Sequence, residues 1–135
     1  MTAEQEVLAA ADALVAAFGR SDRDAYFACF VPQATFLFHP TPGRIESRAA
    51  YEQLWDSWVA QDGFRVISCR STGALVQFLG PDAAVFSHDV LTTVQTNDGE
   101  DTTAERETIV FSRTAGHWLA VHEHLSPDPA AVGGT

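Results

Sequence analysis

Residues 118–126 read Trp-Leu-Ala-Val-His-Glu-His-Leu-Ser, and they are the most informative stretch of the chain. In an extended strand, residues two apart point to the same face. The spacing therefore predicts that His122 and His124 share one face with the aromatic ring of Trp118. The opposite face is expected to carry Leu119, Val121, Glu123 and Leu125. The two histidines are either hydrogen-bonded structural residues of a sheet face or part of a ligand pocket.

The composition indicates one globular domain. The chain has 135 residues, of which 46% are hydrophobic and 19% are charged. This length can bury a core without disulfides or a structural metal. No apolar run approaches the roughly 20 residues that cross a bilayer, and the first residues lack the basic start of a signal peptide. We therefore expect a cytoplasmic protein with no membrane partner.

The charge pattern excludes several kinds of partner and chemistry. The net charge is -10 and the pI is about 4.6, which argues against nucleic acid as a partner. All eight cationic residues are arginine, so no lysine is present for a Schiff base or a phosphate-binding loop. Cys29 and Cys69 show no metal-ligand spacing and are expected to be reduced packing residues. The lysine-free, alanine-rich composition is typical of a high-GC bacterial source.

Three apolar patterns at helical spacing predict three helices in the first half of the chain. The first covers residues 3–18, the second follows a cap at Ser21 or Asp22 and ends at Pro32, and the third runs from a cap at Ser47 to residues 62–63. The second is expected to carry Tyr26, Phe27 and Phe30. A short strand at 34–39 lies between the second and third helices.

After residue 63 the apolar residues alternate, which predicts strands at 64–78, 83–95, 102–113 and 118–126. The turns between them are short enough to make consecutive strands antiparallel neighbours. The chain is therefore expected to be a single α+β domain over residues 1–126, in which three N-terminal helices pack on a curved, mainly antiparallel sheet. Residues 127–135 are expected to be a flexible tail.

An acidic segment surrounds the predicted turn at Asn97. Five carboxylates between Asp98 and Glu107 face one cation, Arg106. This pattern is typical of a solvated hairpin tip that keeps a sheet edge soluble, and we favour that interpretation over a cation site. Arg106 is expected to point outward or to the rim of a pocket. If it pointed inward, it would hold a carboxylate ligand.

The order of these elements and the final Trp-x-x-Val-His-x-His-x-Ser run resemble the SnoaL-like branch of the nuclear transport factor 2 superfamily. The same run resembles the association domain of calmodulin-dependent kinases. The resemblance implies a conical α+β barrel, usually a homodimer, with a pocket between the helices and the concave sheet face. Ketosteroid isomerases, polyketide cyclases and dehydratases share this shell with many non-enzymes. Isomerases and cyclases of the shell use an aspartate in the cone, for which Asp89 has the wrong parity if His88 points inward.

Within this shell, four histidines are expected to converge on one pocket. His88 lies on the more apolar face of its strand, and His39 ends the first strand. The candidate catalytic residues are His122, His124 and His88 as general acids or bases, with Tyr26 as a hydrogen-bond donor to an oxyanion. The candidate pocket-lining residues are His39, Phe38, Trp55, Trp58, Phe86, Val90, Trp118 and Arg106. For Trp118, plain helix–sheet packing is the favoured alternative.

Three hypotheses of function follow, and enzyme status stays open among them. The first is acid–base chemistry on an apolar, carbonyl-bearing small molecule by an isomerase, cyclase or dehydratase type of enzyme. The second is non-catalytic binding in the same pocket. The third is a homodimeric assembly domain that uses the outer sheet face at Leu119, Val121 and Leu125. No cofactor or metal is expected, although His-x-His with a third imidazole is also typical of a metal site.

Overall fold

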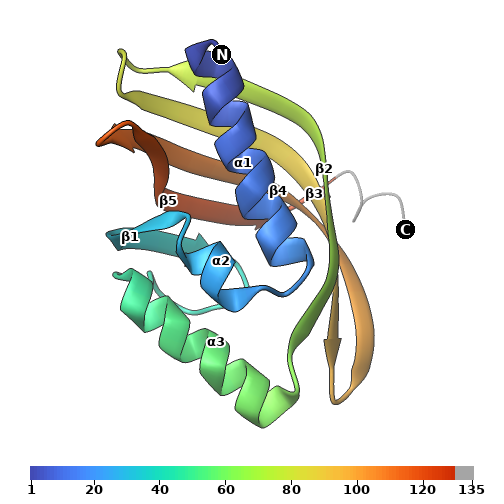
Figure 1. Ribbon diagram of the computed structural model, residues 1–135. Coiled ribbons are helices and arrows are strands. Elements are labelled where there is room, and N and C mark those ends of the chain that lie inside the picture. Colours follow the sequence, from blue (N-terminus) through green and yellow to red (C-terminus); the bar gives the residue numbers. More distant parts are fainter. Residues whose placement is uncertain (130–135) are drawn as a thin grey trace.

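Three helices lie on one side of a five-stranded sheet in the computed structural model, which describes residues 1–129 (Figure 1). The helices are α1 (Ala3–Gly19), α2 (Arg23–Phe27) and α3 (Arg48–Asp62), and the strands are β1 (Phe30–Phe38), β2 (Arg65–Phe78), β3 (Ala83–Thr96), β4 (Gly99–Thr114) and β5 (His117–Pro127). The predicted tail begins inside β5, and residues 130–135 of it lie outside the described residues. No helix among residues 1–129 is long and apolar enough to cross a membrane.

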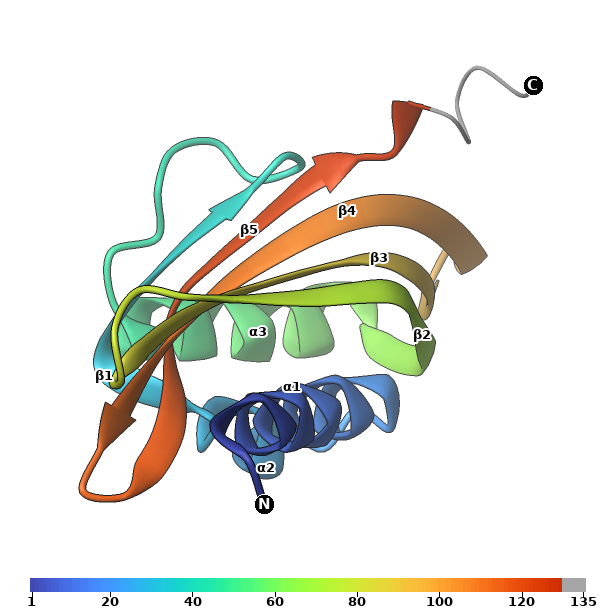
Figure 2. The same cartoon turned by 90° about the horizontal axis from the view of Figure 1, so that it is seen from above.

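The sheet has the strand order β1-β5-β4-β3-β2. Strands β2 to β5 pair in antiparallel fashion with their neighbours, and β1 pairs parallel to β5 at one edge. Figure 2 shows that the sheet curves over the helices, so that its concave face and the helices enclose the interior. The α+β class with a curved, mainly antiparallel sheet is confirmed.

The second helix is shorter than the sequence suggests. It ends at Phe27, and Phe30 begins β1 instead of continuing the helix. Pro32 does not break β1, because β1 is an edge strand and its register with β5 shifts between Phe30 and Thr35. A residue without an N–H group is tolerated at such a place.

Local sequence signals account for where α1 and α3 begin. Thr2 and Gln5 form a capping box at the start of α1, and the Ser47 hydroxyl accepts a hydrogen bond from the backbone N–H of Ala50 at the start of α3. The buried stripe of α1 includes Val7 and Leu14. The aromatic rings of α2 and α3 pack on one another and close the core under the sheet.

A β-bulge in β5 reverses the alternation of its side chains. Ala120 pairs with Phe111, but His122 pairs with Val110, so Val121 is an extra residue in the strand. Before the bulge, Trp118 and Ala120 point to the concave face and are buried. After it, Glu123 takes the buried position, opposite the buried Ile109. The prediction that Trp118 and the two histidines share one face is therefore wrong.

The turn between β3 and β4 docks on the C-terminal end of α3. The backbone N–H of Asn97 donates to the carbonyl oxygen of Asp62 at 2.7 Å, and the Asn97 amide donates to the carbonyl of Gln61 at 3.2 Å. Gly63 ends α3 in the left-handed conformation with a φ of 63°. A Cβ atom there would lie 2.5 Å from the Asn97 side-chain oxygen, so this docking depends on glycine.

We expect Gly63→Ala to destabilise the protein by about 2 kcal/mol, roughly half from the left-handed φ and half from loss of the Asn97 hydrogen bond. Gly80→Ala is the control, because Gly80 also has a positive φ, of 87°, but has open space around it. Urea unfolding of both variants gives the comparison. Equal losses of unfolding free energy in the two variants would show that the Asn97 contact contributes nothing to stability.

Candidate functional site: an apolar cavity with a buried carboxyl pair

A cavity of about 310 Å³ lies between the helices and the concave face of the sheet. Its walls are mainly apolar and aromatic, and they include Leu14, Phe18, Phe38, Trp58, Phe64, Val90 and Leu125. Four carboxyl groups also line it: those of Glu105 and Glu107 on β4 and Glu123 on β5, and that of the exposed Asp62 at the end of α3. Of the described residues that line the cavity, none is an arginine, lysine or histidine. An apolar cavity with a few polar groups is the usual form of a small-molecule site.

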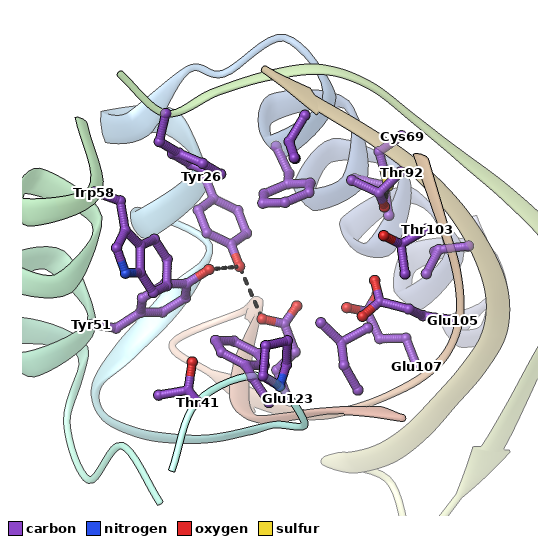
Figure 3. Close-up of a pocket in the computed structure, with 18 of the residues that line it drawn as sticks. Tyr26, Thr41, Tyr51, Trp58, Cys69, Thr92, Thr103, Glu105, Glu107 and Glu123 are labelled. Atoms are coloured by element: carbon purple, nitrogen blue, oxygen red, sulfur yellow. Dashed lines mark hydrogen bonds between the residues drawn. The ribbon is translucent and has the colours of Figure 1, made fainter. Parts of the chain in front are cut away.

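Glu123 is held by the phenol groups of two helices (Figure 3). The Tyr26 hydroxyl donates to Glu123 Oε1 at 2.9 Å, and its oxygen lies 3.0 Å from the Tyr51 hydroxyl. Because the proton of Tyr26 points to Glu123, Tyr51 donates to Tyr26. Burial raises the pKa of both phenols well above 10, so they remain neutral donors. Two phenol groups and one carboxyl group therefore converge at one end of the cavity.

Glu107 and Glu123 form a carboxyl pair that shares a proton. Burial raises the pKa of Glu107 to about 7, and burial together with the neighbouring Glu107 raises the pKa of Glu123 well above its usual 4.5. The two carboxyl groups lie close enough to shift one another's pKa: the contact raises the pKa of Glu123 and lowers that of Glu107. These opposite directions favour the proton on Glu123 and the charge on Glu107. One protonated and one ionised carboxyl group thus stand side by side.

Behind the pair, His88 contacts Glu107 from the neighbouring strand. His88 Nε2 lies 2.6 Å from Glu107 Oε1, and His88 Nδ1 lies 2.5 Å from the hydroxyl oxygen of Ser71 on β2. Burial lowers the pKa of His88 to about 4, so the imidazole is neutral. His88 points inward as the sequence predicts, but Glu107 stands between it and the cavity.

The third carboxyl group has its own partner at the rim. His39 Nε2 lies 2.5 Å from Glu105 Oε2. The His39 side chain is 30% exposed, whereas that of Glu105 is 11% exposed. His39 is thus a rim residue that contacts a cavity carboxyl group without lining the cavity itself.

The SnoaL-like domain model matches residues 7–131. The chain belongs to the SnoaL-like domain family. A putative calcium/calmodulin-dependent protein kinase II association domain from Xanthomonas campestris is similar in structure, with 21% identity, a TM-score of 0.78 and coverage of 96% of this chain and 90% of that chain. A protein from Rhodospirillum rubrum, described as NTF2-like and of unknown function in nutrient uptake, has 18% identity, a TM-score of 0.77 and coverage of 90% and 98%.

A third similar structure contains a ligand. A protein from Catenulispora acidiphila, solved in complex with S-DNPA, has 17% identity, a TM-score of 0.76 and coverage of 96% of both chains. At these identities the structural likeness establishes the fold alone. The role of the cavity in this SnoaL-like domain therefore has to be argued from its own side chains.

The structure does not bring the two histidines of β5 into the cavity of the SnoaL-like domain. After the bulge at Val121, His122 and His124 lie on the outer face of the sheet. His122 Nδ1 lies 2.8 Å from the Thr35 hydroxyl, and its ring is 6.2 Å from that of His124. Leu125, expected outside, lines the cavity instead. The predicted convergence of four histidines on one pocket is wrong for this reason.

The other predicted pocket residues divide between the cavity and the core. Tyr26, Phe38, Trp58 and Val90 line the cavity. Trp55 and Phe86 are buried in the core behind it. Trp118 packs against the core, and its indole N–H donates to Glu6 of α1 at 3.2 Å, which agrees with the packing alternative. Among residues 1–129, no three His, Cys, Asp or Glu side chains lie close enough together to hold a metal ion.

Arg106 is exposed on the outer face, where it pairs across the strands with Asp89 and Ser126. It does not line the cavity, although it was a candidate for that role. It borders a more polar hollow of about 460 Å³ on the outer face, together with His124 and Thr108. The outward orientation expected for Arg106 agrees with the structure.

Sequence reasoning missed Tyr51 and the carboxyl groups of the cavity, those of Asp62, Glu105, Glu107 and Glu123. Glu105 and Glu107 are buried, so the interpretation of all five acidic residues as a solvated hairpin tip is wrong for these two. A signal was present, because Glu105 and Glu107 have the same parity as Ile109 and Phe111, which are buried. No such signal marked Glu123, because the bulge that turns its side chain inward cannot be recognised from the alternation of apolar and polar residues.

Glu107 is expected to make stability depend on pH. Its pKa rises from 4.5 to about 7 on folding, so the unfolded chain ionises this group first and stability falls as the pH rises through this window. Glu107→Gln removes the effect. The difference in unfolding free energy, variant minus native, should rise by up to about 3 kcal/mol between pH 4.5 and pH 8.

Urea unfolding at several pH values measures this difference. His88 contributes in the opposite direction, because its lowered pKa favours folding as the pH rises from 4 to 6.5. It is present in both proteins, so the difference between them reports mainly Glu107. A difference that does not change with pH would contradict a raised pKa for Glu107.

Proposed function

We propose that this SnoaL-like domain binds a small, uncharged, apolar molecule that carries a carbonyl group, and that Glu107 and Glu123 perform acid–base chemistry on it. The observation that carries this proposal is the carboxyl pair with one shared proton at the wall of an apolar cavity. A base and an acid in adjacent positions are what a proton transfer next to a carbonyl requires.

The composition of the cavity wall supports the ligand class. The aromatic and aliphatic side chains favour an apolar body. An anionic ligand would meet four carboxyl groups and no cation among the described lining residues, so it is disfavoured. A carbonyl oxygen, by contrast, is an acceptor that the protonated Glu123 can satisfy as a donor, while the phenols hold Glu123 in place. The complex of the C. acidiphila protein with S-DNPA is a precedent for a bound ligand on this fold.

The proposed step is a proton transfer at the carbon next to the carbonyl group. The Glu107 carboxylate takes a proton from that carbon, and the C–H bond electrons form the enol double bond. The carbonyl oxygen gains negative charge, which a hydrogen bond from Glu123 stabilises, because Glu107 is now protonated and no longer needs that hydrogen. Tyr26 and Tyr51 hold Glu123 in place for this step. Return of the proton to carbon restores Glu107. A pKa of about 7 suits Glu107 to both directions near neutral pH.

A test needs no knowledge of the natural substrate. The probe is 2-acetonaphthone, a neutral ketone of suitable size, whose methyl protons exchange with deuterium from D₂O through the enol. We expect the protein to accelerate this exchange, and Glu107→Gln to reduce the acceleration by a factor of about 10² or more. Proton NMR measures the exchange. Glu100→Gln is the control, because Glu100 is an exposed carboxylate of the same strand.

Binding is measured separately by saturation-transfer NMR with 2-acetonaphthone and 2-naphthoate, its anionic counterpart. The ketone should bind and the carboxylate should not. Binding of the ketone without acceleration of exchange would reject the acid–base step and leave a binding protein. Preferred binding of 2-naphthoate would reject the proposed ligand class.

We also propose that the domain forms a homodimer through the outer face of the sheet. Two large apolar side chains are exposed there, Leu75 at 54% and Leu91 at 40%. Apolar surface of this kind is typical of an interface between copies. The similarity to a protein described as an association domain agrees with this proposal. Leu125 cannot serve in the interface as the sequence suggested, because it faces the cavity.

Light scattering coupled to size exclusion tests the homodimer. The native protein should have twice the chain mass of 14.6 kDa. The variant Leu75→Glu/Leu91→Glu should shift to the monomer mass, because charged groups at the interface would be buried without partners. Val59→Glu is the control, since Val59 is 47% exposed but lies on α3, away from the sheet face. A dimer that survives the double substitution would place the interface elsewhere.

A further inference from the structure

A series of polar contacts connects the edge of the sheet to the cavity: four hydrogen bonds and, between them, the neighbouring carboxyl groups of Glu107 and Glu123. It begins at Ser71 on β2 and passes through His88 on β3 to Glu107 on β4. It continues through Glu123 on β5 to Tyr26 on α2 and Tyr51 on α3. Six elements each contribute one side chain. The proposed function uses the cavity end of this series but gives no role to Ser71 and His88.

Counting donors and acceptors fixes the direction of each bond. A neutral imidazole has one N–H group and one lone pair. An ionised Glu107 can only accept, so His88 Nε2 must carry the hydrogen and Nδ1 must accept from the Ser71 hydroxyl. Glu107 then accepts a hydrogen bond from His88, and the neighbouring Glu123, if protonated, directs its hydrogen at Glu107 from the other side. All the hydrogen atoms in the series point toward Glu107.

We propose that Ser71 and His88 are positioning residues that assign the two roles in the carboxyl pair: His88 holds Glu107 as the proton acceptor, and the shared proton stays on Glu123. This inference rests on the proposed function, because it explains which carboxyl group is the base. Ser71 acts one step further away. By donating to Nδ1 it fixes the tautomer of His88, and only that tautomer can donate to Glu107.

Burial and position in the sheet do not distinguish the two carboxyl groups. Both carboxyl groups are buried on the same face, on neighbouring strands. Glu123 accepts from Tyr26, which by itself would favour the ionised form of Glu123, opposite to the assignment. The donor from His88 is the contact that favours the charge on Glu107. The other titratable groups near this series are Asp12 on α1, Cys69 on β2, Asp89 on β3 and Glu105 on β4.

The contacts of Ser71, His88 and Glu107 have the order of a serine hydrolase triad, but their location favours positioning. Ser71 is exposed on the edge strand β2 and lines neither the cavity nor the outer hollow. A nucleophile needs a bound substrate beside it, and the substrate cavity lies on the far side of Glu107. His88 therefore acts on the cavity through Nε2, the ring nitrogen that contacts Glu107.

The tautomer of His88 provides the first test. In ¹⁵N-labelled native protein at pH 7, long-range proton–nitrogen NMR should show His88 Nε2 protonated and Nδ1 unprotonated. A hydrogen on Nδ1 instead would overturn the proposal, because Nε2 would then accept from a protonated Glu107 and the roles would be exchanged. In Ser71→Ala both tautomers should become populated. A single unchanged tautomer in that variant would remove Ser71 from the proposal.

The second test follows the carboxyl carbons of Glu107 and Glu123 by ¹³C NMR as the pH is raised, with assignments from Glu107→Gln and Glu123→Gln. In His88→Leu the loss of a donor to the carboxylate should raise the midpoint of Glu107 by one pH unit or more, a tenfold change in proton affinity. In His88→Gln the titration midpoint of Glu107 should return most of the way to its native value, since the amide N–H can reach the same oxygen.

If His88 were only structural, both His88 variants would melt at a lower temperature, and the titration midpoints of Glu107 and Glu123 would not change. That result would overturn the proposal. These measurements use the free protein and no ligand. They therefore report the roles of the pair even if 2-acetonaphthone shows no exchange, so the two proposals can fail independently.

Discussion

The β-bulge at Val121 determines which side chains of the last strand reach the interior. Because side chains of a strand alternate, one extra residue exchanges the two faces for the rest of the strand. Trp118 and Ala120 belong to the core before the bulge, and Glu123 and Leu125 belong to it afterwards. The same residue places His122 and His124 on the outer face. The carboxyl pair, its contact with Tyr26 and the character of the cavity all depend on this local geometry.

Burying carboxyl groups in an apolar interior is unfavourable unless their charge is reduced and their oxygens are hydrogen-bonded. In this domain both conditions are met on the concave face. Glu107 and Glu123 share a proton, Tyr26 and His88 donate to them, and His39 contacts Glu105. In the described part of the chain no buried side-chain nitrogen or oxygen lacks a hydrogen-bond partner. Because the donors come from strands and helices, the positions of the carboxyl groups are fixed by the fold itself.

Membership of the SnoaL-like family describes the shell, and the side chains on the concave face give this domain its chemistry. The cavity combines an apolar wall, four carboxyl groups and two phenols. This combination favours an uncharged ligand with an acceptor group over an anion. Within it, the neutral imidazole of His88 supplies an asymmetry that two neighbouring glutamates would otherwise lack. In the proposed reaction, a histidine that does not line the cavity decides which carboxyl group acts as the base.

The sequence by itself determined the local structure: the capped helices, the alternating strands, the short turns and the inward orientation of His88 follow from patterns within a few residues. It also identified Tyr26, Phe38, Trp58 and Val90 as cavity residues, because helical and strand periodicities place them on buried faces. Only the tertiary structure decided that Glu123 points inward and that His122 and His124 point outward, and it also decided that Phe30 belongs to β1. The physical reason is that a bulge or an edge strand is defined by pairing with another strand. Periodicity within one segment does not record the register between two.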